Sequence, residues 1–383
     1  MPSTELRENV LSAAKRLVVK VGTQLLTADD GGRPGLDLAF IASVARQIAA
    51  LRRRGHEVTL VSSGAVGAGC VELGLTRRPT DVADQQAVAA VGQRRLMTHL
   101  HDAFEAEGLH VGQLLLTRSD FDDRTRFLNL RNCVRRLHEM GCVPILNEND
   151  TVAVEEIRFG DNDTLAALMC NAVRAHALVL LTVVEGLLDE DGRRIDLVDD
   201  VEASLGLVRQ EKSGWGTGGM LSKLEAARLV TEAGEVAVIA SGREPDVLVR
   251  LWEGEKLGTV FLPAARKLDS RQRWIGLTAR PGGSVTIDDG AAKAVAARGK
   301  SLLASGVTQV EGAFQRGDVV LVCSSAGQEI ARGLSNYDAE ELRLIAGRQS
   351  DEFETLLGRP AYEEVIHRDN LVVLSAAKGQ ERR

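Results

Sequence analysis

The sequence predicts an α/β protein with a doubly wound, mainly parallel sheet, followed by a small, mainly β domain. Through residues 15–262, short β-branched runs alternate with helical stretches, which is the order of a parallel sheet covered by helices on both faces. The chain of 383 residues exceeds one ordinary domain. After residue 280 the apolar runs become short and turns frequent. We therefore expect domains at 1–262 and 281–370, with a connector at 263–280 and a tail at 371–383.

The composition is that of a globular protein, with 44% hydrophobic and 26% charged residues. The net charge of −7 leaves no global basic field to attract nucleic acid or an anionic membrane. No apolar run approaches the roughly 20 residues that span a bilayer, and the polar start is unlike a signal peptide. We expect a soluble, cytoplasmic protein without a membrane partner.

The cysteines indicate neither a zinc site nor a disulfide framework. They are scattered and form no CxxC pair. We expect buried free thiols in a reducing compartment. The five are Cys70, Cys133, Cys142, Cys170 and Cys323.

Residues 17–21 form the first predicted strand, because a short β-branched run bounded by turn residues fits a sheet covered on both faces. Lys20 is unusual inside such a run, since burying an unpaired ammonium group is costly. One interpretation is an edge lysine that reaches water. The other is a ligand for an anion at the carboxyl end of the strand, where open α/β sheets bind ligands.

The second strand leads into a glycine-rich loop. A helix at 37–54 precedes it, and the strand at 58–61 runs into Ser62-Ser63-Gly64-Ala65-Val66-Gly67-Ala68-Gly69. Such a loop lets backbone N–H groups approach an anion closely, although tight packing alone would also explain it. The glycine order is GxxGxG, so the dinucleotide fingerprint GxGxxG is not met.

The alternation continues to the end of the first domain. A strand at 142–146 should deliver Asn147-Glu148-Asn149-Asp150 at its carboxyl end, and a small hairpin is expected at 152–158. The other predicted elements are strands at 110–116, 177–181 and 236–240, and helices at 82–107, 127–140 and 220–233.

The polar stretch Phe159-Gly160-Asp161-Asn162-Asp163 stands directly before an apolar helical run. Asn and Asp cap helices well, but a cap needs only one of these three polar side chains. The alternatives are a cap with solvated neighbours or a polar site.

A second glycine-rich loop ends the domain, from Gly214 to Lys223. Glycines free the backbone to surround phosphate oxygens, and the helix start carries a partial positive charge. Lys223, in the first turn, opposes that dipole, so an anionic ligand would offset the cost; the alternative is a flexible surface loop.

The last domain shows short strands at 284–287, 306–308 and 318–322. Gly299-Lys300-Ser301 is similar to the end of a Walker A loop. We reject that interpretation because Ala294 replaces the required glycine and a helix, not a strand, precedes it.

Taken together, these motifs resemble the amino-acid kinase family, in particular its members that phosphorylate glutamate. The shared motifs lie in the family's order and spacing: Val19-Lys20-Val21-Gly22-Thr23, Val61-Ser62-Ser63-Gly64-Ala65, Asn147-Glu148-Asn149-Asp150, Gly160-Asp161-Asn162-Asp163 and Gly216-Thr217-Gly218-Gly219-Met220. The C-terminal part resembles a PUA domain through residues 312–318 and 332–337.

The resemblance implies ATP-dependent phosphorylation of the γ-carboxylate of L-glutamate, the first step towards proline. By position it assigns Lys20, Asp163 and Lys223 to catalysis, with Asp163 orienting the two lysines. Glutamate binding is assigned to Ser63, Asn147, Asp150, Asp161 and Asn162. Nucleotide binding is assigned to Lys20, Gly22, Thr182, Val183, Thr217, Gly218, Gly219, Met220, Leu221, Ser222 and Lys223.

The residue types agree with this chemistry. A glutamate side chain has a pKa of about 4.3, so it arrives ionised at neutral pH and needs no general base. Catalysis then depends on positioning and on charge neutralisation by the lysines, backbone N–H groups and Mg²⁺ brought with ATP. No protein ligand for the metal is assigned.

One position departs from the family. Asp usually follows the threonine of the strand that ends at Thr182, and here Val183 stands there, with Glu185 where a basic or polar residue is common. Valine offers only backbone groups for hydrogen bonding, so the contacts that this position makes with the nucleotide stay undetermined. This departure motivates the alternative of a pseudokinase that binds ligands without catalysis. The phosphate-handling residues are present, so an active kinase is expected.

Two further alternatives are a kinase for aspartate or N-acetylglutamate, against which the PUA-like tail argues, and an RNA-binding protein. Residues 281–370 hold nine Lys or Arg, fourteen Asp or Glu and four aromatic residues. RNA binding usually needs a basic face and stacking rings, so RNA is not expected as a partner. The family further suggests a homo-oligomer (dimer or tetramer) that proline inhibits, and glutamate-5-phosphate reductase as the downstream enzyme.

Overall fold

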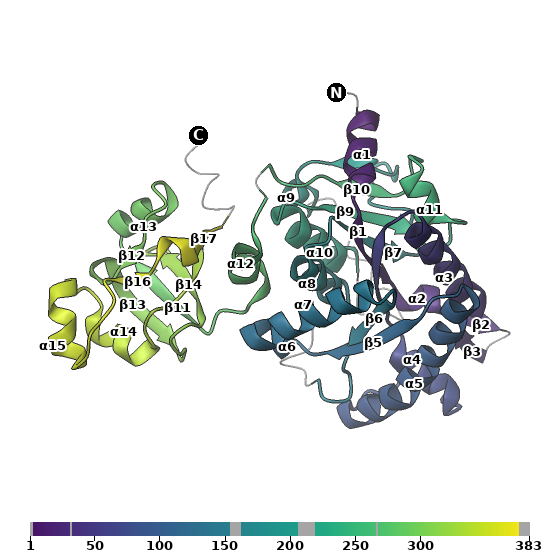
Figure 1. Cartoon of the computed structure of the whole chain (residues 1–383), viewed down its shortest axis with the longest axis horizontal. Coiled ribbons are helices and arrows are strands. Elements are labelled where there is room, and N and C mark those ends of the chain that lie inside the picture. The colour runs from purple at the N-terminus through teal and green to yellow at the C-terminus, as the bar shows by residue number, and fades with distance from the viewer. Residues whose placement is uncertain (1–2, 31–32, 154–161, 206–218, 266, 375–383) are drawn as a thin grey trace. The chain divides into compact units, whose positions relative to one another are not determined.

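The computed structural model describes residues 3–30, 33–153, 162–205, 219–265 and 267–374 (Figure 1). The chain forms two compact units, Met1–Lys267 and Leu268–Arg383, which we describe separately. The division falls inside the stretch predicted as a connector.

The first unit is built on an eight-stranded, mainly parallel sheet, which confirms the predicted fold class. Among the described strand pairs of this sheet, β9 and β10 run antiparallel, and all the others run parallel. The spatial order is β5 (Val111–Leu116), β6 (Val143–Glu148), β4 (Glu57–Val61), β1 (Arg16–Val21), β7 (Ala177–Thr182), β9 (Val236–Ser241), β10 (Thr259–Phe261) and β8 (Leu197–Val198). A small hairpin joins β2 (Thr27–Asp30) to β3 (Arg33–Leu36).

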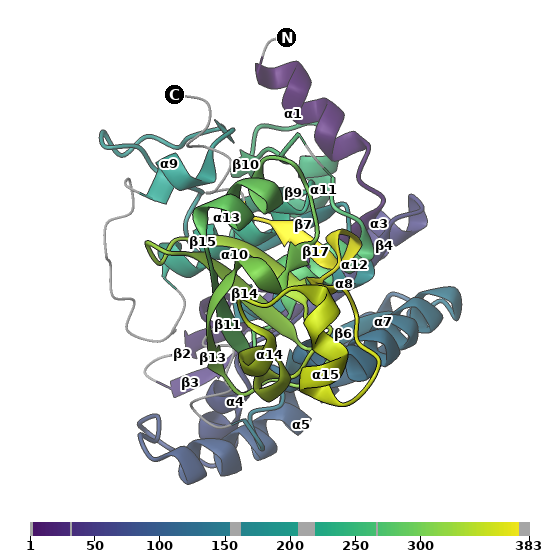
Figure 2. The same ribbon diagram turned by 90° about the vertical axis from the view of Figure 1, so that its left-hand side faces the viewer.

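Helices cover both faces of this sheet (Figures 1 and 2). Side chains alternate along a strand. In β1, Leu17, Val19 and Val21 enter the core beneath α1, α3, α5 and α11. Val18 and Lys20 therefore point to the other face, where α8 contacts β1 and β7 and α10 contacts β7 and β9. The helices are α1 (Ser3–Ser12), α2 (Thr23–Leu26), α3 (Leu38–Arg53), α4 (Ala65–Glu72), α5 (Val82–Ala106), α6 (Ser119–Asp122), α7 (Arg124–Glu139), α8 (Asn162–Val173), α9 (Val201–Leu205), α10 (Met220–Glu232) and α11 (Val247–Trp252).

Local signals explain where these elements begin. The Asp37 carboxylate accepts from the backbone N–H of Phe40 at 2.9 Å and caps α3. Asp81 caps α5 in the same way. Gly64 adopts a φ of 91°, which a β-carbon would strain, and so permits the sharp turn from β4 into α4. One boundary differs from the prediction, because β6 runs to Glu148 and keeps Asn147 inside the strand. The hairpin expected at 152–158 falls almost wholly outside the described residues.

The second unit is small and mainly β, as predicted. Its core lies between a five-stranded sheet and the helices packed on it. The sheet order is β13 (Val307–Gly312), β11 (Gly283–Ile287), β14 (Val319–Ser324), β15 (Glu329–Leu334) and β17 (Leu371–Val373), and a second pair joins β12 (Leu302–Leu303) to β16 (Glu364–Ile366). The helices are α12 (Ser270–Arg273), a π-helical turn (Trp274–Thr278), α13 (Asp289–Ala296), α14 (Ala339–Ile345) and α15 (Phe353–Leu357), and short 3₁₀ turns lie at Ala304–Gly306, Ser350–Glu352 and Arg368–Asn370.

The structure tests two expectations drawn from composition, one about membrane-spanning segments and one about the cysteines. In the described residues, no helix is both long and apolar enough to cross a bilayer. All five cysteines are free thiols. Cys70 and Cys170 are buried, and Cys142 and Cys323 are partly buried. Cys133 is exposed on α7, so the expectation of buried thiols was wrong for this residue. That position lies on the outer side of an amphipathic helix, which scattered cysteine spacing does not reveal.

Candidate active site

Four neighbouring strands end at one edge of the first unit's sheet. In the parallel register Lys20 of β1 lies beside Val61 of β4 and Leu180 of β7, and Val61 lies beside Leu146 of β6. The residues that follow these positions therefore gather at the carboxyl edge, where open α/β sheets bind ligands. The polar motifs predicted as a site come from these strand ends and from the first turns of α8 and α10.

A buried carboxylate joins two lysines at this edge. Lys20 Nζ lies 2.7 Å from Asp163 Oδ1, and Lys223 Nζ lies 3.0 Å from Asp163 Oδ2. Asp163 is completely buried, and the lysines are only 4% and 6% exposed. The interpretation of Lys20 as an edge lysine that reaches water is thus wrong, since Lys20 points onto the α8 face and meets the first turn of that helix.

Electrostatics keep the Asp163 carboxyl ionised. Burial by itself would raise its pKa, but the ammonium groups of Lys20 and Lys223, through charge and hydrogen bonds, hold the pKa well below its usual range. Asp163 therefore carries a fixed negative charge at neutral pH. It can orient the two ammonium groups, but it cannot act as a proton acceptor there.

The first turn of α10 is arranged around the same carboxylate. The Ser222 hydroxyl has two acceptors within hydrogen-bond distance, Asp163 Oδ2 at 3.1 Å and the carbonyl oxygen of Gly219, at the start of the helix, at 2.9 Å. We expected an anionic ligand to offset the position of Lys223 against the helix dipole. Within the protein, Asp163 supplies a negative charge beside this lysine.

A cluster of amides and hydroxyls lies next to this centre. Asn162 Nδ2 lies 2.8 Å from the carbonyl oxygen of Ser62, 2.9 Å from Ser63 Oγ and 2.8 Å from Asn147 Oδ1. Asn162 and Asp163 are consecutive at the start of α8, so one helix start holds both groups. The predicted residues Ser63, Asn147 and Asn162 are thereby brought into direct contact.

The structure adds one side chain that the sequence motifs did not indicate. Asn147 Nδ2 donates to Gln93 Oε1 at 2.7 Å. Gln93 lies in the middle of α5, far from the predicted loops in the sequence. A polar residue within a long helix carries no local signal of such a contact, because it depends on how α5 packs beside β6.

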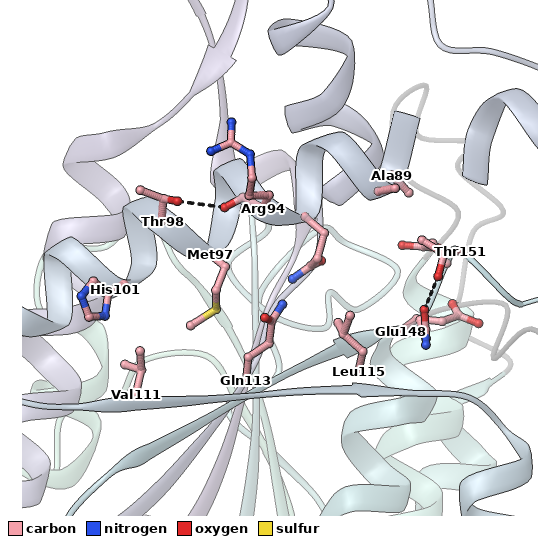
Figure 3. A pocket seen from close by; sticks show the side chains of 14 residues that line it. Ala89, Arg94, Met97, Thr98, His101, Val111, Gln113, Leu115, Glu148 and Thr151 are labelled. Atoms are coloured by element: carbon pink, nitrogen blue, oxygen red, sulfur yellow. Dashed lines mark hydrogen bonds between the residues drawn. The ribbon is translucent and has the colours of Figure 1, made fainter. Parts of the chain in front are cut away.

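Asp150 lies to one side of the amide cluster. It follows β6 and lines a groove of about 610 Å³ between α5 and β5, together with Gln93, Glu148 and Thr151. Figure 3 shows Glu148 and Thr151 at one end of this groove and His101 at the other. The residues predicted to bind glutamate thus divide between the buried cluster and the mouth of this groove.

The predicted nucleotide residues lie along the opposite part of the edge. Gly22 directly follows β1, and a β-carbon built there would lie 4.0 Å from Lys20 Nζ, so this position adjoins the ammonium group. Thr182 ends β7, and Val183 directly after it is 42% exposed. Gly219, Met220 and Leu221 begin α10, with Leu221 exposed. Asp161, Thr217 and Gly218 lie outside the described residues.

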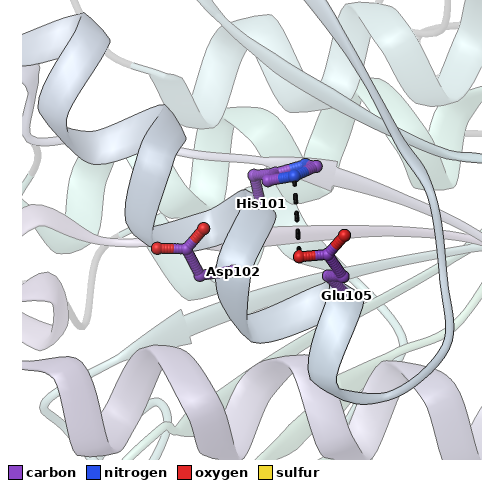
Figure 4. Close-up of side chains that lie close together, drawn as sticks. All are labelled: His101, Asp102 and Glu105. Carbon is purple, nitrogen blue, oxygen red and sulfur yellow. Dashed lines mark ion pairs between the residues drawn. The ribbon is translucent and has the colours of Figure 1, made fainter.

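Among the described residues, one cluster of side chains could hold a metal ion, and it lies elsewhere. His101, Asp102 and Glu105 project from the exposed surface of α5, with His101 Nε2 3.9 Å from Glu105 Oε2 (Figure 4). All three are exposed, and exposed acidic groups are common without a metal ion. At the Asp163 centre, ion pairs to lysine engage both carboxylate oxygens of Asp163.

A doubly wound sheet with two buried lysines at its carboxyl edge defines an α/β protein with a cationic ligand site, and the family comparison gives the class of enzyme. The model of the amino acid kinase family matches residues 15–241, and the PUA domain model matches residues 283–357. The chain belongs to the amino acid kinase family, within it to the glutamate 5-kinases, as its relatives show.

These relatives match over nearly their whole length. A glutamate 5-kinase from Cyanothece sp. is 48% identical over 364 residues, which cover 93% of this chain and 99% of the relative. One from Syntrophotalea carbinolica is 46% identical and covers 96% of this chain and 100% of the relative. Another, from Geobacter sulfurreducens, is 45% identical with 96% and 100% covered. The predicted family and the PUA tail are thus confirmed.

Proposed function

We propose that this chain transfers the γ-phosphoryl group of ATP to the γ-carboxylate of L-glutamate and forms L-glutamyl 5-phosphate, the first step of proline biosynthesis. Family membership supports the substrate, and the Lys20–Asp163–Lys223 centre supports the chemistry. A buried carboxylate holding two ammonium groups at a ligand edge is the single observation that carries the mechanism.

The reaction needs no proton acceptor. Glutamate is ionised at neutral pH because its side-chain pKa is about 4.3. A carboxylate oxygen forms the bond to the γ-phosphorus, the bond from that phosphorus to the β–γ bridging oxygen breaks, and its electron pair leaves with ADP. The obstacle is the repulsion between a carboxylate and a polyphosphate. Lys20 and Lys223 oppose it, since positioned positive charge stabilises the charge that develops on the transferring group.

Asp163 holds both lysines in place during this transfer. Its two oxygens face different ammonium groups at 2.7 and 3.0 Å, so one rigid residue fixes the distance between them. Such fixed geometry avoids reorganisation in the transition state. Mg²⁺ would enter with ATP and neutralise phosphate charge, held mainly by the phosphates and water.

The two substrates occupy neighbouring parts of the edge in this proposal. Glutamate contacts Ser63, Asn147, Asp150 and Asn162, with Asp161 beside them. The nucleotide contacts Gly22, Thr182, Val183 and the segment from Thr217 to Lys223, and Lys20 reaches its phosphates. The amide cluster supports the first assignment, because amide and hydroxyl groups can pair with the substrate's ammonium and carboxylate groups.

The test is a coupled assay of ADP release with glutamate, aspartate and N-acetylglutamate side by side. Hydroxylamine is added to trap an acyl phosphate as the hydroxamate. We expect turnover and hydroxamate with glutamate alone. Preference for either other acid would replace the proposed substrate, and nucleotide binding without any turnover would favour a pseudokinase.

We also propose a homo-oligomer in the cytoplasm that passes its product to glutamate-5-phosphate reductase. The edge strand β5 supports association, because its outer side pairs with no described strand. The acyl phosphate is a reactive anhydride, which favours rapid use by the next enzyme. Light scattering and a product-transfer assay with the reductase test the two parts.

A further inference from the structure

Contacts with two backbone groups identify the nitrogen and the oxygen of both carboxamides in the amide cluster. The carbonyl oxygen of Ser62 can only accept a hydrogen bond, so the atom of Asn162 that lies 2.8 Å from it must be nitrogen. The backbone N–H of Glu148 can only donate, so the atom of Asn147 that lies 2.9 Å from it must be oxygen. The same oxygen accepts from Asn162 Nδ2, which makes the two assignments consistent.

The nitrogen of Asn147 consequently faces α5. It lies 2.7 Å from Gln93, and because an amide nitrogen only donates, Gln93 must present its oxygen. Asn147 is only 2% exposed, so water does not readily replace this acceptor. Gln93 therefore completes a chain of hydrogen bonds that runs from α5 through Asn147 to Asn162.

The other end of the chain faces the ligand edge. Asn162 Nδ2 has two hydrogens, and it faces three acceptors on one side. Its oxygen is thus turned away from them; it is buried, and no group in the described part of the chain donates to it. A buried acceptor without a donor is costly, and it suits a donor carried by a ligand, such as the ammonium group of an amino acid.

We propose that Gln93 is a positioning residue for the amino-acid substrate. By accepting from Asn147, it holds Asn147 in the orientation that fixes the Asn162 nitrogen, and so it keeps the Asn162 oxygen available to the substrate's ammonium group. Gln93 acts through these two side chains. This inference rests on the proposed function, since it assumes that the cluster binds glutamate.

The test compares two substitutions that differ in one property. Gln93→Leu removes the acceptor at similar size, whereas Gln93→Glu keeps an oxygen acceptor. For Gln93→Leu we expect KM for glutamate to rise about tenfold, as for a buried donor left without its partner. KM for ATP should stay within about twofold of wild type. Gln93→Glu should keep KM for glutamate within about threefold, whereas a role limited to packing would leave KM for glutamate unchanged in both variants.

Gln85→Leu is the matched control, because Gln85 lies on the same helix and its side chain donates to the carbonyl oxygen of Pro79, not to the amide cluster. It should leave both KM values unchanged. In an Asn147→Ala background, Gln93→Leu should have no further effect on KM for glutamate if it acts through Asn147. Thermal melting checks that each variant is folded.

The outcomes separate this inference from the proposed function. A wild-type protein that forms no hydroxamate from glutamate would refute the function. An active wild type with an unchanged KM in Gln93→Leu would refute the positioning role alone. An equal rise of KM for glutamate and ATP, or a full tenfold effect in the Asn147→Ala background, would also overturn it.

Discussion

Replacing Asp163 with asparagine should destabilise the first unit strongly while keeping the shape of the side chain. The substitution removes the negative charge that faces two ammonium groups at 2.7 and 3.0 Å in a site with almost no solvent exposure. Removing one partner of a buried ion pair costs about 3–5 kcal/mol of the free energy of unfolding. At roughly 2–4 °C per kcal/mol for a domain of this size, the melting temperature should fall by about 10 °C.

The assay is thermal melting of both proteins across pH, with and without MgATP. The pKa of Asp163 is lowered in the folded state, so its stabilisation is present above its ordinary pKa near 4 and is lost as pH falls below that value. The difference between wild type and Asp163→Asn should be constant from pH 6 to 8 and shrink in acid. MgATP should raise the melting temperature more in the variant, because its phosphates restore negative charge beside the lysines.

Glu253→Gln is the control, because Glu253 pairs with Arg54 at 2.7 Å while both side chains are about half exposed. An exposed pair contributes at most about 1 kcal/mol, so this change should barely move the melting temperature. Equal stability of Asp163→Asn and wild type at pH 7 would refute the claim that the carboxylate offsets two buried charges.

Three further predictions concern turnover. Lys223→Ala should lower kcat on the order of 10²-fold or more while calorimetry still detects glutamate binding, since its ammonium group faces the transferring phosphate; wild-type kcat in the folded variant would end this assignment. Val183→Asp should lower KM for ATP severalfold and leave KM for glutamate alone, because the exposed position after β7 gains an acceptor worth about 1.5–3 kcal/mol; an effect on glutamate only would place Val183 on the wrong side of the site. A protein ending at Lys267 should fold and phosphorylate glutamate, because the site residues precede the second unit; a folded but inactive product would show that the tail completes the site or the oligomer.

The sequence alone determined the elements and their class. Helix α3 could be predicted almost to the residue, because its cap, its apolar spacing and the glycine after it are all local signals. The run of β-branched residues in β1 indicated a strand buried on both faces, which the structure confirms. The order and spacing of the motifs were also sufficient to predict the family, because a motif depends only on residue identity and spacing.

The family resemblance implied that Asp163 orients the two lysines, but local sequence signals do not encode that contact, and only the tertiary structure gives its physical basis. Lys20 and Asp163 are far apart in the sequence, and their contact requires β1 to lie between β4 and β7 with α8 covering the face to which Lys20 points. The contact of Gln93 with Asn147 requires α5 to lie beside the end of β6. Local periodicity shows which face of a strand or helix is apolar, but it does not show which other element packs against that face. Pairing between distant segments depends on the packing of the whole core, and that packing turned separate polar motifs into one buried site.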